Sequence, residues 1–341
     1  MKKITILTAL FLSLVLLFST PTAFSEEKPV TLGFISLNLN HPFFVAMMEA
    51  SAEADKDFNS TSIWKSCESN IDTEIALIDS FIEQGVDCIL LSPVDTAAII
   101  PAIERAIEAG IPVVTMSNVV DVEKSVATTF ELHTAGVNQA KLMGTLMKGE
   151  GKCAYIVGIP GNDTSDTMQR GFEAGMKENW PNIKYQILIS NYDAPTALAE
   201  TEKYLAANPD VKAIGSCTDD ALIAASDAFN KLDVFVIGMD GVDEAVARVA
   251  ANKWNSTIIV GARRLGYWNT KIGAELARGA EFPHITKMPM GWLLSEDTIP
   301  VVKANNLLEG EVVYGAAKAD ELLNGYRIEF GPGTKAADFF Q

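Results

Sequence analysis

The chain has 341 residues and a formal net charge of −17 at pH 7, and 48% of its residues are hydrophobic. Its acidic balance argues against binding to nucleic acid or to an anionic membrane surface, because both need clustered Lys and Arg side chains. The length exceeds what one hydrophobic core usually serves, so we expect two domains.

Residues 1–25 have the pattern of an export signal. Lys2 and Lys3 precede an apolar stretch at 4–18, and small residues stand before Glu26. The apolar stretch is too short to span a bilayer as a stable helix. Removing 25 residues from 341 leaves 316, and losing two lysines changes the net charge from −17 to −19. We therefore expect a mature exported protein in the periplasm of a bacterium with two membranes.

From Val30 onward, short apolar runs alternate with amphipathic helical stretches. Glycines such as Gly85 and Gly110 stand where helices are expected to stop. The apolar runs are continuous, as in parallel strands buried on both faces. The first half predicts strands at 30–36, 61–66, 86–92 and 111–117, with helices at 42–57, 71–84 and 97–109.

The same alternation restarts after a polar segment at 118–124. Segments 256–261, 262–278 and 287–294 are expected to cross back between the two halves, and the tail from about 308 to be loosely held. The pattern predicts an α/β fold of two doubly wound parallel-sheet domains. The second half predicts helices at 134–148, 165–178, 195–206, 219–230 and 242–251, with strands at 153–159, 185–190, 211–216 and 234–240.

The four cysteines are expected to stay free and mostly buried. Cys67 and Cys88 fall at opposite ends of two predicted parallel strands, and so do Cys153 and Cys217. Opposite strand ends lie well beyond the roughly 7 Å Cα separation that a disulfide tolerates.

Polar residues gather where the predicted strands end. In open parallel sheets, ligands bind beyond the carboxyl ends of the strands and near helix N-termini. Ser, Thr, Asn and Asp also cap helices, so part of this polarity is structural. The segments concerned are 36–44, 92–96, 117–119, 159–168, 217–220 and 239–243.

Five stretches carry a resemblance to a known family. They read "LNLNHPFFVAMMEASAEADK", "GVDCILLSPVDTAAIIPAIERAIEAGIPVVTMSN", "RGFEAGM", "CTDDALIAASDAF" and "VIGMDG". Over about 30–290 the chain resembles the type I periplasmic sugar-binding proteins of ABC importers, relatives of the ribose and galactose receptors. The resemblance implies two lobes joined by a three-stranded hinge. The lobes would be 26–131 plus 261–289 and 132–260 plus 290–341.

The resemblance also implies a set of ligand-binding residues. Aromatic faces at Phe43 and Phe44 would pack on the C–H surface of a sugar, while Asp240 would accept hydrogen bonds from its hydroxyls. The structural alternatives are core packing for the two rings and helix capping for Asp240. The full expected set is Asn38, His41, Phe43, Phe44, Asn118, Asp166, Met168, Thr218 and Asp240.

Three departures from the family pattern bear on the ligand. Ser117 and Asn118 replace an Asp-Arg pair, Met168 stands where the family has Arg, and Val260 where it has Gln. Losing two guanidiniums removes forks of fixed hydrogen-bond donors. A deoxy sugar, a furanose derivative or a polyol would suit such a site. Arg263 or Arg264 could supply a replacement charge, although a surface role is favoured for both.

No catalytic, cofactor or metal motif stands out. No G-x-G-x-x-G follows a predicted strand, the three histidines show no metal-ligand spacing, and no local Ser-His-Asp or Cys-His arrangement is present. We expect no enzyme activity, no cofactor, no metal and no nucleic acid.

The favoured hypothesis is a monomeric receptor that closes around a small sugar or polyol-like ligand and delivers it to the membrane subunits of an ABC permease. A second hypothesis keeps the fold, but the closed form signals to a chemoreceptor or sensor kinase. A third, less favoured, is an exported carbohydrate-active enzyme.

Overall fold

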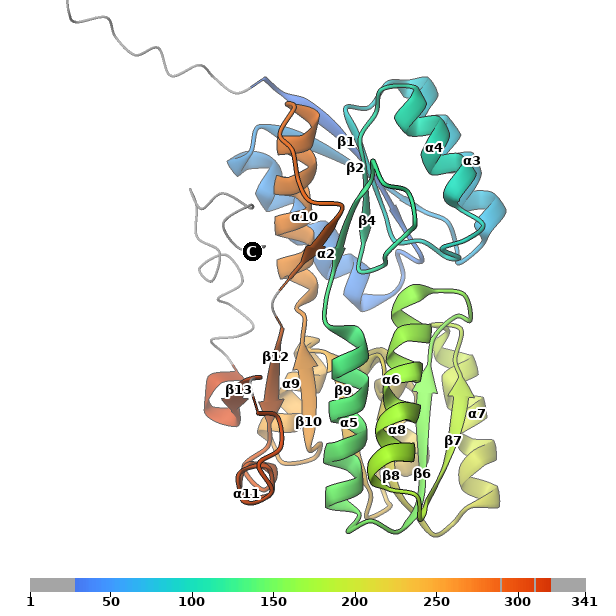
Figure 1. Ribbon diagram of the computed structural model, residues 1–341, viewed down its shortest axis with the longest axis vertical. Coiled ribbons are helices and arrows are strands. Elements are labelled where there is room, and N and C mark those ends of the chain that lie inside the picture. The colour runs from blue at the N-terminus through green and yellow to red at the C-terminus, as the bar shows by residue number, and fades with distance from the viewer. Residues whose placement is uncertain (1–27, 289, 310, 320–341) are drawn as a thin grey trace, which may run out of the picture.

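The computed structural model describes residues 28–288, 290–309 and 311–319. Within these ranges the chain forms two sheets, each flanked by helices on both faces and placed one above the other (Figure 1). We call each sheet with its helices a lobe. This architecture confirms the predicted α/β fold of two doubly wound domains. The predicted export signal at 1–25 and the end of the predicted tail lie outside the described residues.

The first lobe contains six strands in the order β11-β5-β4-β3-β1-β2, all paired in parallel. Helices α2 and α10 pack on each other, while α3 and α4 cover the opposite face (Figure 1). The elements are β1 Val30–Ser36, α2 Pro42–Asp57, β2 Ser60–Ser66, α3 Ile71–Gln84, β3 Cys88–Leu91, α4 Ile100–Glu108, β4 Val113–Met116, β5 Val126–Thr129, α10 Ala262–Ala277 and β11 Ile285–Lys287.

The second lobe contains seven strands in the order β13-β12-β10-β9-β8-β6-β7. Only the pairing of β10 with β12 is antiparallel. Its elements are α5 Leu132–Leu146, β6 Gly151–Val157, α6 Asp163–Asn179, β7 Ile183–Ile189, α7 Ala194–Ala207, β8 Val211–Ser216, α8 Asp219–Phe229, β9 Phe235–Asp240, α9 Asp243–Ala250, β10 Ser256–Ile259, β12 Gly291–Leu294, α11 Thr298–Ala304 and β13 Val312–Gly315. A short 3-10 helix, η1 Ala316–Lys318, follows β13.

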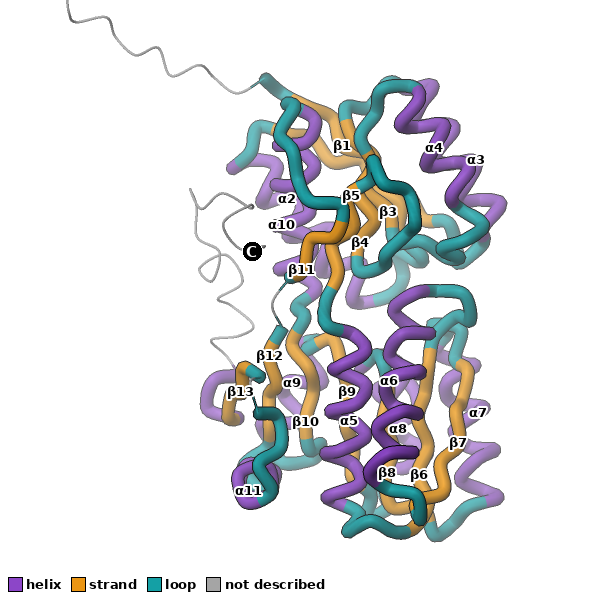
Figure 2. The backbone as a smooth tube through the Cα atoms, in the orientation of Figure 1, coloured by secondary structure: helices purple, strands orange, loops and turns teal. Residues whose placement is uncertain are grey.

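The chain passes between the lobes three times: after β5, after β10 and between β11 and β12 (Figure 2). These crossings confirm the expected three-stranded hinge. The segment predicted as one closing element at 287–294 in fact contributes to both sheets. The sequence pattern missed β5, α11 and β13, because elements of four to seven residues are too short to show a period.

Helices α5 and α6 approach each other at glycines. A Cβ at Gly136 would lie 2.3 Å from the carbonyl oxygen of Met168, and one at Gly171 would lie 2.2 Å from that of His133. Only glycine allows this backbone contact. It fixes the rotation of α6, and hence which side chains of its first turn face the other lobe.

The four cysteines are free and buried, as the strand directions predict. No helix within the described ranges has both the length and the apolarity needed to cross a bilayer.

Candidate functional site

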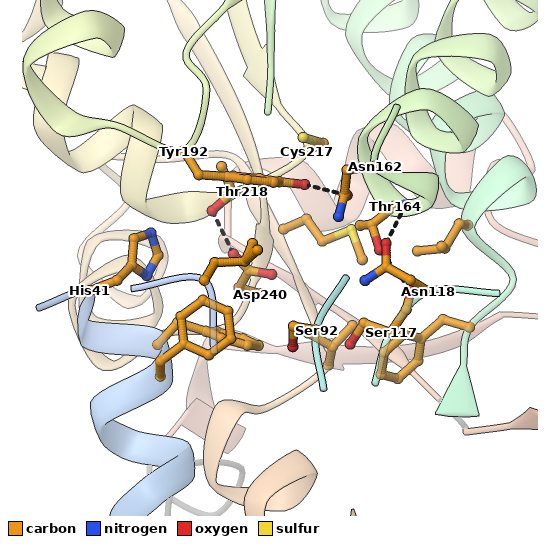
Figure 3. A pocket seen from close by; sticks show the side chains of 17 residues that line it. His41, Ser92, Ser117, Asn118, Asn162, Thr164, Tyr192, Cys217, Thr218 and Asp240 are labelled. Atoms are coloured by element: carbon orange, nitrogen blue, oxygen red, sulfur yellow. Dashed lines mark hydrogen bonds between the residues drawn. The ribbon is translucent and has the colours of Figure 1, made fainter. Parts of the chain in front are cut away.

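A cavity lies between the lobes, where the carboxyl ends of strands from both sheets face each other. It encloses about 630 Å³, counting solvent at its mouth. In Figure 3, Tyr192 lies on one side and Ser92 and Ser117 on the other, with Asp240 between them. The lining residues are Leu37, His41, Phe43, Phe44, Ser92, Ser117, Asn118, Phe130, Leu132, Asn162, Thr164, Tyr192, Cys217, Thr218, Met239, Asp240 and Val260.

Direct hydrogen bonds join the lobes beside the cavity. Asn162 donates from Nδ2 to the Pro93 carbonyl at 2.8 Å. The Thr164 amide donates to Oδ1 of Asn118 at 3.1 Å, and its hydroxyl donates to the Ser117 carbonyl at 2.7 Å. These hydrogen bonds connect the loops after β3 and β4, in the first lobe, to the start of α6, in the second lobe. The structure therefore represents a closed form.

The aromatic part of the cavity comes from both lobes. Pro42 opens α2, and its fixed φ suits the first turn of a helix, so Phe43 and Phe44 follow directly at the strand-to-helix junction. The two rings meet edge to face with centroids 5.6 Å apart, and Phe44 is 8% exposed. From the second lobe, the Tyr192 hydroxyl donates to Oδ1 of Asn162 at 3.1 Å. This bond holds the Tyr192 ring at the cavity wall.

Asp240 is the acidic group of the cavity. It ends β9 with φ of 124°, outside the usual range for a residue with a side chain. Its Oδ2 accepts hydrogen bonds from the Thr218 hydroxyl at 2.7 Å and the Asp219 amide at 3.3 Å. Burial raises the pKa of Asp240 to about 7, because both donors are neutral and offset only part of the lost hydration.

His41 and Asp220 form an ion pair across the cleft. Nδ1 of His41, the N-cap residue of α2, lies 2.9 Å from Oδ2 of Asp220, in the first turn of α8. Their side chains are only 16% and 12% exposed. Burial by itself lowers the pKa of His41, but the contact with Asp220 outweighs it, and the net pKa is raised above 6.5. This contact links the two lobes and favours the protonated form of the imidazole.

Asp219 lies beneath the cavity and organises its floor. Its Oδ2 accepts from the Gly241 amide at 2.8 Å, the Val242 amide at 3.3 Å and the Thr257 hydroxyl at 2.7 Å. Burial, then the nearby Asp240 charge, raises the pKa of Asp219 well above its usual value. The side chain is fully buried, so its role is to fix the loop that carries Asp240.

The structure brings six predicted site residues to the cavity and leaves three elsewhere. His41, Phe43, Phe44, Asn118, Thr218 and Asp240 line it.

The other three have structural contacts. Asn38 accepts the Asn40 amide at 2.8 Å, and Asp166 accepts the Gly161 amide at 3.1 Å. Met168 is fully buried. Its backbone contacts α5 at Gly136, so this part of α6 faces α5 rather than the cavity.

Several lining residues were absent from the predicted set. Ser92, Ser117, Asn162 and Thr164 fall in the loops marked by sequence but were not included among the predicted site residues. Tyr192 lies in the turn after β7 with φ of 55°. The sequence signal that could have identified Tyr192 is an aromatic residue within the polar stretch "SNYDA".

Arg263 and Arg264, which the sequence offered as possible replacement charges for the ligand, do not line the cavity. Arg263 lies 3.0 Å from Asp243 and 3.9 Å from Glu49. Arg264 donates from Nε to the Val260 carbonyl at 3.0 Å.

Two tests of other chemistry concern metals and nucleophiles. In the part of the chain that the structure describes, no three His, Cys, Asp or Glu side chains are placed to hold a metal ion. Burial raises the pKa of the lining thiol Cys217 to about 12, so this thiol stays protonated and is a weak nucleophile.

Comparison with known proteins places this geometry in a family. Residues 32–281 match the model of the periplasmic binding protein domain. The ribose import binding protein of Bacillus subtilis (strain 168) is 26% identical over 279 residues, which cover 80% of this chain and 90% of that protein.

Two solved structures share the fold. An ABC transporter solute-binding protein from Actinobacillus succinogenes with bound D-allose is 24% identical, with a TM-score of 0.72 over 80% of this chain and 100% of its own. One from Mycobacterium smegmatis with bound glycerol is 24% identical, with a TM-score of 0.73 over 80% of this chain and 96% of its own. The match to the family model covers well over half of the chain, and the chain therefore belongs to the periplasmic binding protein family.

Proposed function

We propose that this protein captures a small sugar or polyol between its lobes and delivers it to an ABC permease. The observation that carries the proposal is the interlobe cavity, whose wall combines the partly buried carboxyl of Asp240 with aromatic side chains from both lobes. A sugar has apolar C–H faces and hydroxylated edges, so rings and a carboxylate match it. The import and sugar-binding roles named for the relatives support the same assignment.

The mechanism is lobe closure without bond chemistry. A ligand that touches residues of both lobes stabilises the closed form and shifts the population toward it. We propose lobes of 26–131 with 261–289, and 132–260 with 290–341. The sheet membership of the strands within these ranges supports these boundaries.

Within the cavity, each lining group has a role. We assign the apolar faces to Phe44 and Tyr192, with Phe43 supporting Phe44, and the hydroxyl-accepting role to Asp240. Thr218 orients Asp240 through their 2.7 Å hydrogen bond. Asn118 and His41 act mainly in closure, because both already bond to the opposite lobe.

The compartment and partners follow from the same assignment. We propose that the export signal at 1–25 sends the chain to the periplasm, where it acts as a monomer and its closed form docks on the permease. The same closed form could serve a chemoreceptor or sensor kinase. The transport output is favoured because the relatives include an import binding protein and ABC transporter components.

A thermal-shift panel of pentoses, hexoses, deoxy sugars, furanoses and polyols tests the proposal. A ligand at 100 times its Kd adds about 2.7 kcal/mol to the free energy of unfolding. For a chain of this size we expect Tm to rise by roughly 5 °C. The assignment fails if no sugar or polyol, neutral or amino-substituted, stabilises the protein, and conversion of a bound sugar to product would favour the enzyme hypothesis.

The His41–Asp220 pair predicts that ligand affinity depends on pH. The open form exposes His41 to water, where its pKa is near 6.5, whereas the closed form raises it. Closure therefore gains a contribution that is fully present below about pH 6.5 and is lost as the pH rises through the raised pKa of His41. Wild type should bind about tenfold more tightly than Asp220→Asn at pH 6, with little difference at pH 8.5.

Because Asp220 also raises the pKa of Asp240, the ratio of the two proteins' Kd values reports the titration of His41 together with that of Asp240. Calorimetric titrations across this pH range measure the ratio. A ratio that does not change with pH would show that the ion pair plays no part in closure.

A further inference from the structure

We propose that the ligand of this cavity carries a protonated amine, as amino sugars and amino polyols do. The inference rests on the proposed function and names the ligand class more narrowly. It is carried by a charge imbalance in the cavity wall, by the pairing of the cationic side chains near it, and by the aromatic rings that line the same cavity.

Within the described part of the chain, the cavity wall carries one acid, Asp240, and its only basic side chain, His41, is paired with Asp220. None of its lining residues is Lys or Arg, and Asp240 is its acidic member. Asp219 and Asp220, in the first turn of α8, add two more carboxyl groups; the charge of Asp220 raises the pKa of Asp240, and that of His41 lowers it. A carboxylate buried in such surroundings needs a counter-charge, and the ligand can supply it.

The cations near the cavity already have other partners. His41 lies 2.9 Å from Asp220, so its charge is shared with that carboxylate across the cleft. Arg264 follows the lining residue Val260 along the chain but points its Nε at the Val260 carbonyl. Arg263 lies at Asp243 and Glu49. Asp240 itself receives hydrogen bonds from two neutral donors, the Thr218 hydroxyl and the Asp219 amide.

The amide side chains of the wall are also committed. Asn118 uses Oδ1 for the Thr164 amide and Nδ2 for the Met116 carbonyl. Asn162 uses Oδ1 for the Ser165 amide and the Tyr192 hydroxyl, and Nδ2 for the Pro93 carbonyl. Each Nδ2 keeps one hydrogen for a ligand hydroxyl, whereas both amide oxygens are occupied, and Asp240, which receives only neutral donors, can still accept a cation.

Aromatic rings complete an environment suited to an ammonium group. Phe43 and Phe44 enter from α2, and Tyr192 from the turn after β7. Ring faces attract cations, most strongly where water is excluded. A carboxyl group among three rings therefore favours a protonated amine over a hydroxyl of the same size, and it disfavours a carboxylate or phosphate.

Matched skeletons test the inference by calorimetric titration at pH 7. One series is D-glucose, D-glucosamine, N-acetyl-D-glucosamine and D-glucuronate. A second is D-sorbitol, 1-amino-1-deoxy-D-sorbitol and D-gluconate, and a third is glycerol, 2-amino-1,3-propanediol and glycerate. Within the skeleton that binds most tightly, we expect the amine to bind at least tenfold more tightly than the neutral members and the anion to show no binding.

Two variants locate the preference. Asp240→Asn should abolish the advantage of the amine over the alcohol. Asp227→Asn, exposed on α8 of the same lobe, should preserve it.

Each remaining result decides between the two proposals. A neutral member that equals the amine, or an anion that binds most tightly, overturns the amine inference and leaves the sugar receptor intact. The amine inference is also overturned, and the sugar receptor kept, if panel sugars bind and none of the amines binds. If neither the panel nor the three series binds, the receptor function itself fails.

Discussion

Asp240→Asn should weaken binding of the protein's ligand by about 10- to 100-fold. A hydrogen bond to a charged acceptor contributes roughly 1.5–3 kcal/mol, and each 1.4 kcal/mol corresponds to a tenfold change in Kd. Asn keeps an oxygen for the Thr218 hydroxyl and tolerates positive φ better than most residues, so the loop at Gly241 should retain its conformation. Calorimetric titration with the ligand found by thermal shift gives the change in Kd.

Stability provides the control for this variant. Removing a buried carboxyl beside Asp219 and Asp220 should leave the free energy of unfolding unchanged or raise it, because burial without a counter-charge costs free energy. Asp227→Asn, an exposed acid on α8 of the same lobe, should alter Kd by less than about twofold, as expected for a surface substitution. Wild-type affinity in Asp240→Asn would remove Asp240 from the binding site.

Asp219→Ala should destabilise the second lobe by about 3–5 kcal/mol. The substitution leaves the Gly241 and Val242 amides and the Thr257 hydroxyl without their acceptor in a buried region. Each unsatisfied buried group costs roughly 1–3 kcal/mol. Urea unfolding followed by tryptophan fluorescence measures the effect, since Trp254 and Trp292 are both buried in this lobe.

Asp219→Asn should cost far less than Asp219→Ala, within about 1.5 kcal/mol. Burial raises the pKa of Asp219 and thereby favours its protonated form, whose shape and charge an amide reproduces. Asp233→Ala removes an exposed acid from the same lobe and should change the free energy of unfolding by less than about 0.5 kcal/mol. Equal losses for Asp219→Ala and Asp233→Ala would contradict the role given to Asp219.

The order of the long elements could be predicted because its causes are local. Asn70 accepts the Thr73 amide at 2.9 Å and Gly85 ends the helix with φ of 67°, so α3 begins and ends at the predicted residues. β8 likewise spans the predicted 211–216. Caps, glycines and apolar runs act within a few residues of one another, and a single sequence displays them directly.

The site could be predicted only in part, because side-chain direction depends on distant packing. Met168 and Asn162 both fall near the start of α6, yet Asn162 lines the cavity and Met168 is buried. The contact of α5 with α6 at Gly136 and Gly171 decides between them.

The sequence by itself determined the alternation of strands and helices, the family, and the acidic and aromatic residues at Asp240, Phe43 and Phe44. Periodicity and short motifs encode these features locally. Only the tertiary structure decided that Tyr192 comes to the cavity and that His41 pairs with Asp220. These contacts join loops from different lobes, and their distance depends on how two separate sheets are oriented about the hinge, which no local pattern specifies.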